Sequence, residues 1–336
     1  MPWALAPVVI NAPMSAVATK DLACAVTSAG GLGFIGFDDP RHLNVQLEEA
    51  KSLLKNVTIP SNVLPIGVGI IALNGPPSDF LPVFANHKPI AVWLSFGEAT
   101  DFLRWSTSIR SVSPNTKVWI QVGSVSAAVQ AAKTCQPDVL VLQGSDAGGH
   151  GHARGSSIVT LIPEVVDTFA EHGIEEIPLV AAGGIMDGRS AAAAIMLGAS
   201  GVVMGTRFLA ASEAKLPAAY RREIFQATDG GDATVRSRVF DEMWSPNAWP
   251  DLYDGRCLRN ACYDDVQNGL SIEQMRERLY NNIYKNQNQE VDAKDVNSFW
   301  AGSGVGMVNK LENAEDIVES TRNDTRNRLT NALNWF

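Results

Sequence analysis

The sequence predicts an α/β protein built on a (β/α)8 TIM barrel, with a helix-rich insertion after the eighth strand. Short apolar segments rich in Val, Ile and Leu recur along the chain, and segments of helical periodicity separate them. These apolar segments lack in-out alternation, so they belong in a parallel sheet covered on both faces. Eight such units most economically close into a barrel, whereas a doubly wound open sheet is the alternative.

The composition fits one large core and a small-molecule ligand. The chain has 336 residues, of which 46% are hydrophobic and 19% charged, and this suits a barrel with an insertion. The net charge of −9 argues against nucleic acid or an anionic membrane as the main partner. Neither a signal peptide nor a long apolar run is visible, and the four cysteines lack zinc-ligand spacing. We therefore expect a cytoplasmic protein without a bound metal.

The strands and helices are expected to alternate from the N-terminus. The expected strands are Val8 to Ile10, Leu32 to Phe37, Leu64 to Ile71, Ile90 to Ser95, Lys117 to Val122, Val139 to Leu142, Ile177 to Ala182 and Gly201 to Gly205. Thr19 is the expected N-cap of the first helix, and Asp39-Pro40 opens the second because proline is tolerated in a first turn. The later helices are expected at Glu98 to Ile109, Ser124 to Thr134, Glu164 to His172, Arg189 to Leu197 and Ala314 to Leu333.

The alternation stops after the eighth strand. Residues 212–298 contain a helical segment at Glu213 to Ala227, an irregular aromatic stretch, and a helix opened by the capping box Ser271-x-x-Gln274. We therefore assign residues 1–211 and 299–336 to the barrel and 212–298 to an insertion. Its place after the last strand predicts that it covers the barrel mouth.

The loop after the sixth strand has the strongest functional signal. It reads Gln143-Gly144-Ser145-Asp146-Ala147-Gly148-Gly149-His150-Gly151-His152. Its glycines allow positive φ angles and close approach to a flat ligand, so that His150 is presented without bulky neighbours. An ordinary turn with an exposed histidine would explain the same residues. His152, two residues further on, is expected at the rim or in solvent.

Two further glycine turns follow the seventh and eighth strands. They are Ala181-Ala182-Gly183-Gly184-Ile185 and Val203-Met204-Gly205-Thr206-Arg207. In α/β barrels these two loops commonly bind a phosphate, because glycines expose backbone N–H groups beside a helix N-terminus. Either turn alone could be a tight connection, but their joint placement favours a phosphate site.

In this order, the motifs resemble those of the nitronate monooxygenases, formerly called 2-nitropropane dioxygenases, over nearly the whole chain. Asn11-Ala12-Pro13-Met14 and Trp300-Ala301-Gly302 are part of the same pattern. The resemblance implies an FMN-dependent barrel that oxidises alkyl nitronates with O2 to a carbonyl compound and nitrite. Neutral nitroalkanes are further candidate substrates.

The resemblance also implies roles for individual residues. His150 matches the catalytic histidine, either as the base or as the residue that binds the nitronate. The residues that match the FMN site are Ala12, Pro13, Met14, Gly69, Gln121, Gln143, Gly148, Gly149, Gly183, Gly184, Met204, Gly205 and Thr206. Gly69 departs from the pattern because many members have Asn there, so only its backbone could contact the flavin.

The same motifs resemble those of other flavin enzymes. Flavin enoyl-acyl carrier protein reductases and NADH:quinone reductases share this scaffold, and a flavin-binding protein without turnover is a third hypothesis. The chain has no separate GxGxxG fingerprint, but NAD(P)H can stack directly over FMN in such barrels without one. The motifs therefore indicate the flavin more firmly than the substrate.

Overall fold

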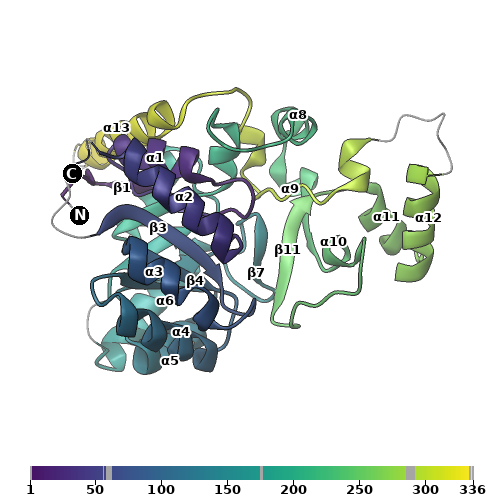
Figure 1. The fold of residues 1–336 in the computed structure, drawn as a ribbon. Helices are drawn as coiled ribbons and strands as arrows, with labels where there is room; N and C mark the ends of the chain where they lie inside the picture. Colours follow the sequence, from purple (N-terminus) through teal and green to yellow (C-terminus); the bar gives the residue numbers. More distant parts are fainter. Residues whose placement is uncertain are drawn as a thin grey trace.

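Eight parallel strands form the central sheet of the computed structural model, in the order β1-β9-β8-β6-β5-β4-β3-β2. Figure 1 labels three of them, β1, β3 and β4, with helices packed around them. Their bounds are β1 (Val8–Asn11), β2 (Phe34–Ile35), β3 (Leu64–Ile71), β4 (Pro89–Ser95), β5 (Lys117–Val122), β6 (Val139–Gln143), β8 (Leu179–Ala182) and β9 (Gly201–Met204). The two ends of this order meet where the Leu32 N–H donates to the Val9 carbonyl at 3.1 Å. The sheet is therefore a barrel, and the open-sheet alternative is wrong.

The structure describes residues 2–55, 57, 63–174, 177–284, 292–332 and 334. Residue 333, the last of the expected closing helix, lies outside the described residues. So do residues 285–291 of the expected insertion and residues 335 and 336 of the expected barrel segment. In the described part of the chain, no helix combines the length and the apolar character needed to cross a membrane. The cytoplasmic location stays a prediction.

Helices cover the outside of the barrel. They are α1 (Lys20–Ser28), α2 (Pro40–Leu53), α3 (Leu81–His87), α4 (Ala99–Val112), α5 (Val125–Cys135), α6 (Ile158–Glu171), α7 (Gly188–Met196) and α13 (Ala314–Ala332), with a 3-10 turn η1 (Pro77–Asp79) before α3. The last helix, α13, packs against both α7 and α1 and so completes the ring. Helix α6 begins at Ile158 instead of Glu164. Burial of its apolar face keeps its first turns helical despite Pro163.

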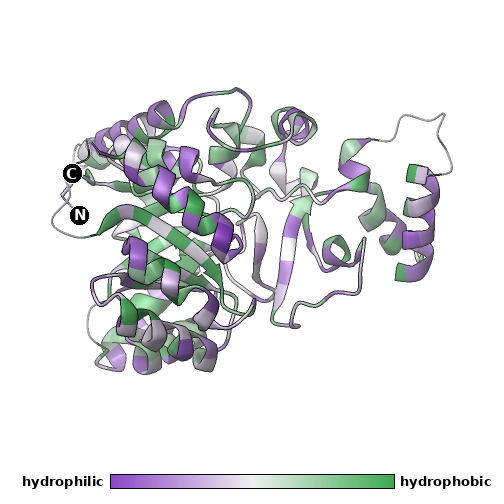
Figure 2. Cartoon of the chain, viewed as in Figure 1, coloured by the Kyte–Doolittle hydropathy of each residue, from purple (hydrophilic) through white to green (hydrophobic). Residues whose placement is uncertain are grey.

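The apolar residues of the barrel form two layers. Figure 2 shows the barrel strands mainly in green, and the helices around them mixed in colour. One layer lies between strands and helices, and the other fills the barrel interior. The interior layer contains Phe34, Trp93 and Trp119, whose ring centroids lie 5.2–6.0 Å apart. The barrel is therefore a packed core below its mouth.

The described part of residues 212–298 forms a region beside the barrel mouth that contains strands as well as helices. The helices are α8 (Ala218–Gln226), α9 (Gly230–Ala233), α10 (Val239–Glu242), α11 (Ala261–Gln267) and α12 (Ile272–Tyr284). Among the described residues, the 3-10 turn η3 (Ala293–Val296) also lies in this region, and η2 (Thr206–Ala210) and η4 (Val305–Met307) lie on either side of it in the sequence. The capping box of α12 is confirmed, because Ser271 and Gln274 each accept the other's backbone N–H. The boundaries of this region stay predictions.

A small antiparallel sheet that was not predicted joins this region to the barrel. Strand β11 (Tyr253–Leu258) pairs with β10 (Thr234–Ser237) on one side and with β7 (Gly149–His152) on the other. Strand β7 is the glycine-histidine segment of the loop after β6. The segment predicted as a turn is thus a strand, because a partner distant in sequence pairs with its backbone.

The buried Asn11 side chain strengthens the narrow contact between β1 and β2. Its Nδ2 donates to the Phe34 carbonyl at 2.8 Å, and its Oδ1 accepts the Phe34 N–H at 2.9 Å. The amide therefore substitutes for backbone pairing at the place where the barrel closes. Because Ala12, Pro13 and Met14 follow directly, Asn11 also fixes where the loop after β1 begins.

We expect Asn11→Ala to lower the free energy of unfolding by about 2–4 kcal/mol, because it leaves a buried N–H and a buried carbonyl of Phe34 without partners. Urea unfolding measures this change. Asn297→Ala is the control, since that amide donates to a backbone carbonyl at an exposed position. Equal losses in the two variants would contradict the role of Asn11.

Candidate active site

A cavity of about 480 Å³ lies at the carboxyl ends of the barrel strands. Residues at or after the ends of β1, β3, β4, β5, β6, β8 and β9 line it. At its floor the Trp93 indole N–H donates to Gln121 Oε1 at 3.2 Å. This is the face at which barrel enzymes place their active sites.

His150 lies in the wall of the cavity, on β7. Its ring stacks on Trp249, with centroids 4.0 Å apart and planes inclined by 16°, and Trp300 lies 4.6 Å away. The Nε2 atom of His150 lies 2.7 Å from Oδ1 of Asp241, and the histidine side chain is 15% exposed. Gln143 Nε2 donates to the His150 carbonyl at 3.0 Å. The imidazole is therefore fixed by an aromatic wall, a carboxylate and its own backbone.

The structure brings nearly all of the predicted site residues to this cavity. Those that line it are Ala12, Pro13, Met14, Gly69, Gln121, Gln143, Gly148, Gly149, His150, Gly183, Gly184, Gly205 and Thr206. Met204 is the exception, because its side chain is fully buried in the layer between strands and helices. Successive side chains of a strand point to opposite faces, so Val203 faces the cavity and Met204 faces away from it.

At two of the predicted glycines, close contacts with other parts of the protein explain why a side chain is absent. A β-carbon on Gly69 would lie 2.4 Å from the Pro13 Cβ, so Gly69 leaves room for the proline ring. A β-carbon on Gly148 would lie 2.4 Å from the backbone of Ala301 and Gly302. The departure at Gly69 therefore has a structural reason.

Gly149 and Gly205 instead border free space. A β-carbon on Gly149, whose φ is +72°, would meet no atom within 4 Å, and one on Gly205 would meet only Ala12 Cβ at 3.5 Å. Both residues line the cavity, so their missing side chains leave room inside it. A flat ring beside Gly149 and a phosphate beside Gly205 are compatible with this space.

The segment 302–303 links two of the cavity loops. Ser303 Oγ donates to Asp146 Oδ1 at 2.9 Å, and the Gly302 N–H donates to Thr206 Oγ1 at 2.9 Å. Arg207 pairs with Glu312 and does not line the cavity. Among the described residues that line it there is no Lys or Arg. Among the described lining residues, backbone N–H groups and hydroxyls, and not cationic side chains, would therefore bind a phosphate.

Strand β11 is anchored to two barrel loops. The Tyr253 hydroxyl donates to the Gly97 carbonyl at 3.0 Å and accepts the Gly97 N–H at 3.1 Å. Burial raises the pKa of Tyr253 to about 12, so the hydroxyl keeps the proton that it donates. Arg256 donates to the Ser145 carbonyl at 3.2 Å. These contacts hold the small sheet against the barrel mouth.

His152 does not line the cavity. Its ring packs edge-on against Tyr253 at 5.4 Å and lies next to Gly123, and the residue is partly exposed, so it does not lie free in solvent, and the expected place at the rim stays a prediction. Burial lowers its pKa below the ordinary value of 6.5, and the Arg236 guanidinium lowers it further. The rival histidine is therefore a packed, uncharged side chain at neutral pH.

Comparisons with known proteins agree with this geometry. A family model described as nitronate monooxygenase matches residues 83–324. The nitronate monooxygenase npaC of Metarhizium robertsii is 40% identical, over 99% of this chain and 95% of its own. A nitronate monooxygenase of Neurospora crassa is 37% identical, over 96% of this chain and 90% of its own.

The chain belongs to the nitronate monooxygenase family. It is thus a flavin-dependent oxidoreductase by family. Among solved structures, FabK from Thermotoga maritima matches with a TM-score of 0.75 and 25% identity, over 98% of this chain and 95% of that one. This likeness agrees with the barrel described above.

Several residues around His150 in this nitronate monooxygenase family member were not assigned to the site from the sequence. Phe96, Trp249 and Trp300 line the cavity beside His150, and Asp241 lies behind it; of these, Trp300 had been noted as part of the family pattern without a role in the site. Phe96 directly follows β4, so its place at a strand end was an available signal. It adopts φ +58°, which is uncommon for a bulky residue. Asp241 and Trp249 had no local signal, because they reach His150 only through the pairing of β11 with β7.

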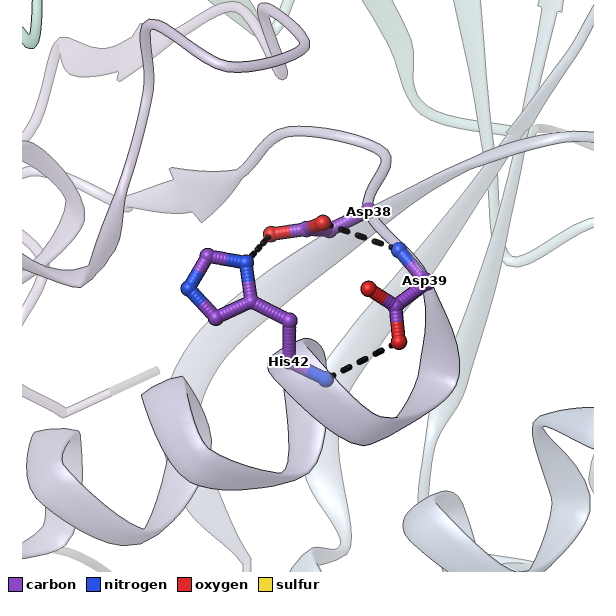
Figure 3. Close-up of side chains that lie close together, drawn as sticks. All are labelled: Asp38, Asp39 and His42. Carbon is purple, nitrogen blue, oxygen red and sulfur yellow. Dashed lines mark hydrogen bonds and ion pairs between the residues drawn. The ribbon is translucent and has the colours of Figure 1, made fainter.

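Asp38, Asp39 and His42 lie close together at the start of α2 (Figure 3). Asp39 Oδ1 accepts the backbone N–H groups of Arg41 and His42, at 2.9 and 3.2 Å. Asp38 pairs with the His42 ring and accepts a hydrogen bond from Gln46. These contacts are those of a helix cap, and we assign no metal to this cluster.

We expect His152→Asn to make the free energy of unfolding less dependent on pH between about pH 7.5 and about pH 5.5. The unfolded chain binds a proton on His152 near pH 6.5, but the folded chain binds it only at lower pH, so stability falls as pH falls through this range. Urea unfolding at about pH 7.5 and about pH 5.5 should show a smaller loss in the variant, by at most about 1.4 kcal/mol per pH unit.

Part of the loss should remain in the variant, because burial also lowers the pKa of His87. His172→Asn, at an exposed site, controls for removal of a histidine. An unchanged pH dependence in His152→Asn would contradict the assignment.

Proposed function

We propose that this enzyme binds FMN and oxidises alkyl nitronates with O2, giving a carbonyl compound and nitrite. The observation that carries the proposal is His150, held between aromatic rings in the wall of a cavity whose glycine turns match the family's FMN motifs. A nitronate is a small anion on an apolar chain. The cavity pairs one imidazole with largely apolar walls, which suits such a substrate.

We assign the FMN site to the following groups. The segment Ala12 to Met14 and the backbones of Gly69 and Gly149 would border the flavin ring, with Gln121 and Gln143 beside it. Backbone N–H groups at Gly183, Gly184, Gly205 and Thr206 would hold the phosphate. The free space beside Gly149 and Gly205 supports this fit. When bound, FMN supplies the redox chemistry, and the chain supplies orientation and electrostatics.

His150 is the proposed catalytic residue. With a neutral nitroalkane it accepts the proton from the α-carbon, because an imidazole can gain and lose a proton near neutral pH. With a preformed nitronate its charged form pairs with the anion, and no Lys or Arg among the described lining residues competes for that role. Trp249, Trp300 and Phe96 limit access of water to the imidazole.

We further propose that residues 212–298 cover part of the barrel mouth. Tyr220 and Trp249 come from this region and line the cavity beside residues of the barrel loops. The region also supplies Asp241, the partner of His150. Its contribution to the cavity wall makes it a determinant of substrate size.

The deciding experiment is an assay of nitrite release from alkyl nitronates of increasing chain length, with oxygen consumption followed in parallel. We expect yellow protein, oxygen uptake and nitrite release. Bleaching of the flavin by NAD(P)H without oxygen, and no nitrite, would replace the proposal with a reductase. Flavin binding without turnover on either substrate class would leave only a flavin-binding protein.

We expect His150→Asn to lower turnover of a neutral nitroalkane by about 10²–10⁴-fold, the usual contribution of a positioned base. Preformed nitronate has already lost its proton, so its oxidation should fall much less while FMN stays bound. His152→Asn is the matched control, because His152 lies outside the cavity. Equal losses on both substrates, or a larger effect at His152, would overturn the assignment.

We expect Gly205→Asp to give a folded but colourless protein. The new carboxylate would enter the free space beside Gly205 and repel the FMN phosphate, weakening binding by at least about 100-fold. Gly231→Asp adds the same charge at an exposed position and should keep its flavin. Flavin absorbance per protein, with circular dichroism as the test of folding, measures both. Full flavin occupancy in Gly205→Asp would remove Gly205 from the site.

A further inference from the structure

We propose that Asp241 is a positioning residue that fixes His150 with its proton on Nε2, so that Nδ1 is the nitrogen that accepts the substrate proton. The role given to Nδ1 in catalysis rests on the proposed function. The placement of the proton on the ring does not, and it can be measured without substrate.

The hydrogen-bond geometry dictates the location of the proton. Nε2 of His150 lies 2.7 Å from Oδ1 of Asp241, and the two side chains are 15% and 9% exposed. An ionised carboxylate can only accept, so Nε2 must donate. A neutral imidazole carries one N–H, and therefore Nδ1 keeps a free lone pair. Nδ1 makes no hydrogen bond within the described part of the chain.

The aromatic rings prevent the opposite arrangement. Trp249 stacks nearly parallel to the imidazole at 4.0 Å, and Trp300 approaches it at 4.6 Å. A flip of the imidazole about Cβ–Cγ, which would put Cε1 in place of Nε2 beside Asp241, has to pass these side chains. The imidazole is therefore held in the orientation that directs Nε2 to Asp241.

Asp241 has few partners of its own. Its Oδ2 is buried and has no hydrogen-bond partner among the described residues, and His150 is the described partner of Oδ1. A carboxylate buried for structural reasons normally accepts several hydrogen bonds, because an unsatisfied buried oxygen is costly. A carboxylate with a single described partner, which is the histidine of the cavity wall, points to a role in positioning that histidine.

The surrounding structure holds the two residues in a common frame. His150 lies on β7, and Asp241 lies on α10, shortly after β10 of the same small sheet. The neighbour of Asp241, Phe240, is buried, and its carbonyl accepts a hydrogen bond from Ser298 Oγ at 2.8 Å. The distance between His150 and Asp241 is thus set by sheet pairing and by packing of α10.

The proposed step is the transfer of a proton from the α-carbon of the nitroalkane to His150. The α-C–H bond of the nitroalkane breaks, its proton goes to Nδ1, and its electron pair forms the C=N bond of the nitronate while the nitro oxygens take the negative charge. The imidazolium that results lies against the Asp241 carboxylate, which stabilises its positive charge. Removing the carboxylate should therefore slow proton abstraction more than it weakens substrate binding.

The first test is nitrogen NMR of the protein labelled with 15N-histidine, recorded at a pH at which the His150 ring is neutral. The signals of His150 are identified by their loss in His150→Asn. We expect a protonated Nε2 and an unprotonated Nδ1 in the wild type. A proton on Nδ1 instead would overturn the proposal whatever the variants do. This measurement does not depend on catalysis. If the tautomer is the expected one but no nitrite is released, the proposed function is rejected and the placement of the proton on Nε2 stands.

The second test compares Asp241→Asn with Asp251→Asn, an exposed aspartate of the same region that pairs with Arg238. In Asp241→Asn we expect kcat on a nitroalkane to fall about 10²–10⁴-fold, with KM and flavin content little changed and a smaller effect on preformed nitronate. Asp251→Asn should match the wild type. An Asp241→Asn enzyme with wild-type kcat on the nitroalkane, or with equal losses on both substrates, would overturn the proposal.

Discussion

The antiparallel pairing of β7 with β11 is the interaction on which the site depends. It places His150 opposite Gly255, and a β-carbon on Gly255 would lie 2.3 Å from the Trp300 ring. The glycine therefore lets Trp300 pack close to the imidazole. The same ladder leads through β10 to Asp241. The backbone hydrogen bonds of this one sheet thus bring together His150 of the barrel loop, the aromatic rings beside it and the Asp241 carboxylate, which lie far apart in the sequence.

The barrel could be predicted because its signals are local. Strands β3 and β5 have the predicted bounds, since a strand that is mostly buried reads as a mainly apolar segment. The glycine turns at Gly183 and Gly205 could be predicted for a similar reason. A turn at the carboxyl end of a barrel strand faces the mouth whatever the rest of the chain does.

The remaining features depend on contacts that no local pattern reports. Strands β10 and β11 carry Arg236, Asp254 and Arg256, so neither reads as an apolar run. Without their pairing, β7 looks like a glycine-rich turn, and Asp241 looks like one of many surface carboxylates. Met204 is a different case, because strand alternation from the cavity residue Val203 already implies that its side chain faces the helices.

The tryptophans of the cavity have a spectroscopic consequence. Trp93 forms the floor, and Trp249 and Trp300 form the wall beside His150. An absorbing, conjugated molecule anywhere in this cavity lies within a few ring widths of all three indoles, where transfer of excitation energy is efficient. Native tryptophan emission is therefore a label-free signal of whether the cavity is filled, and it is built into the same rings that shape the site.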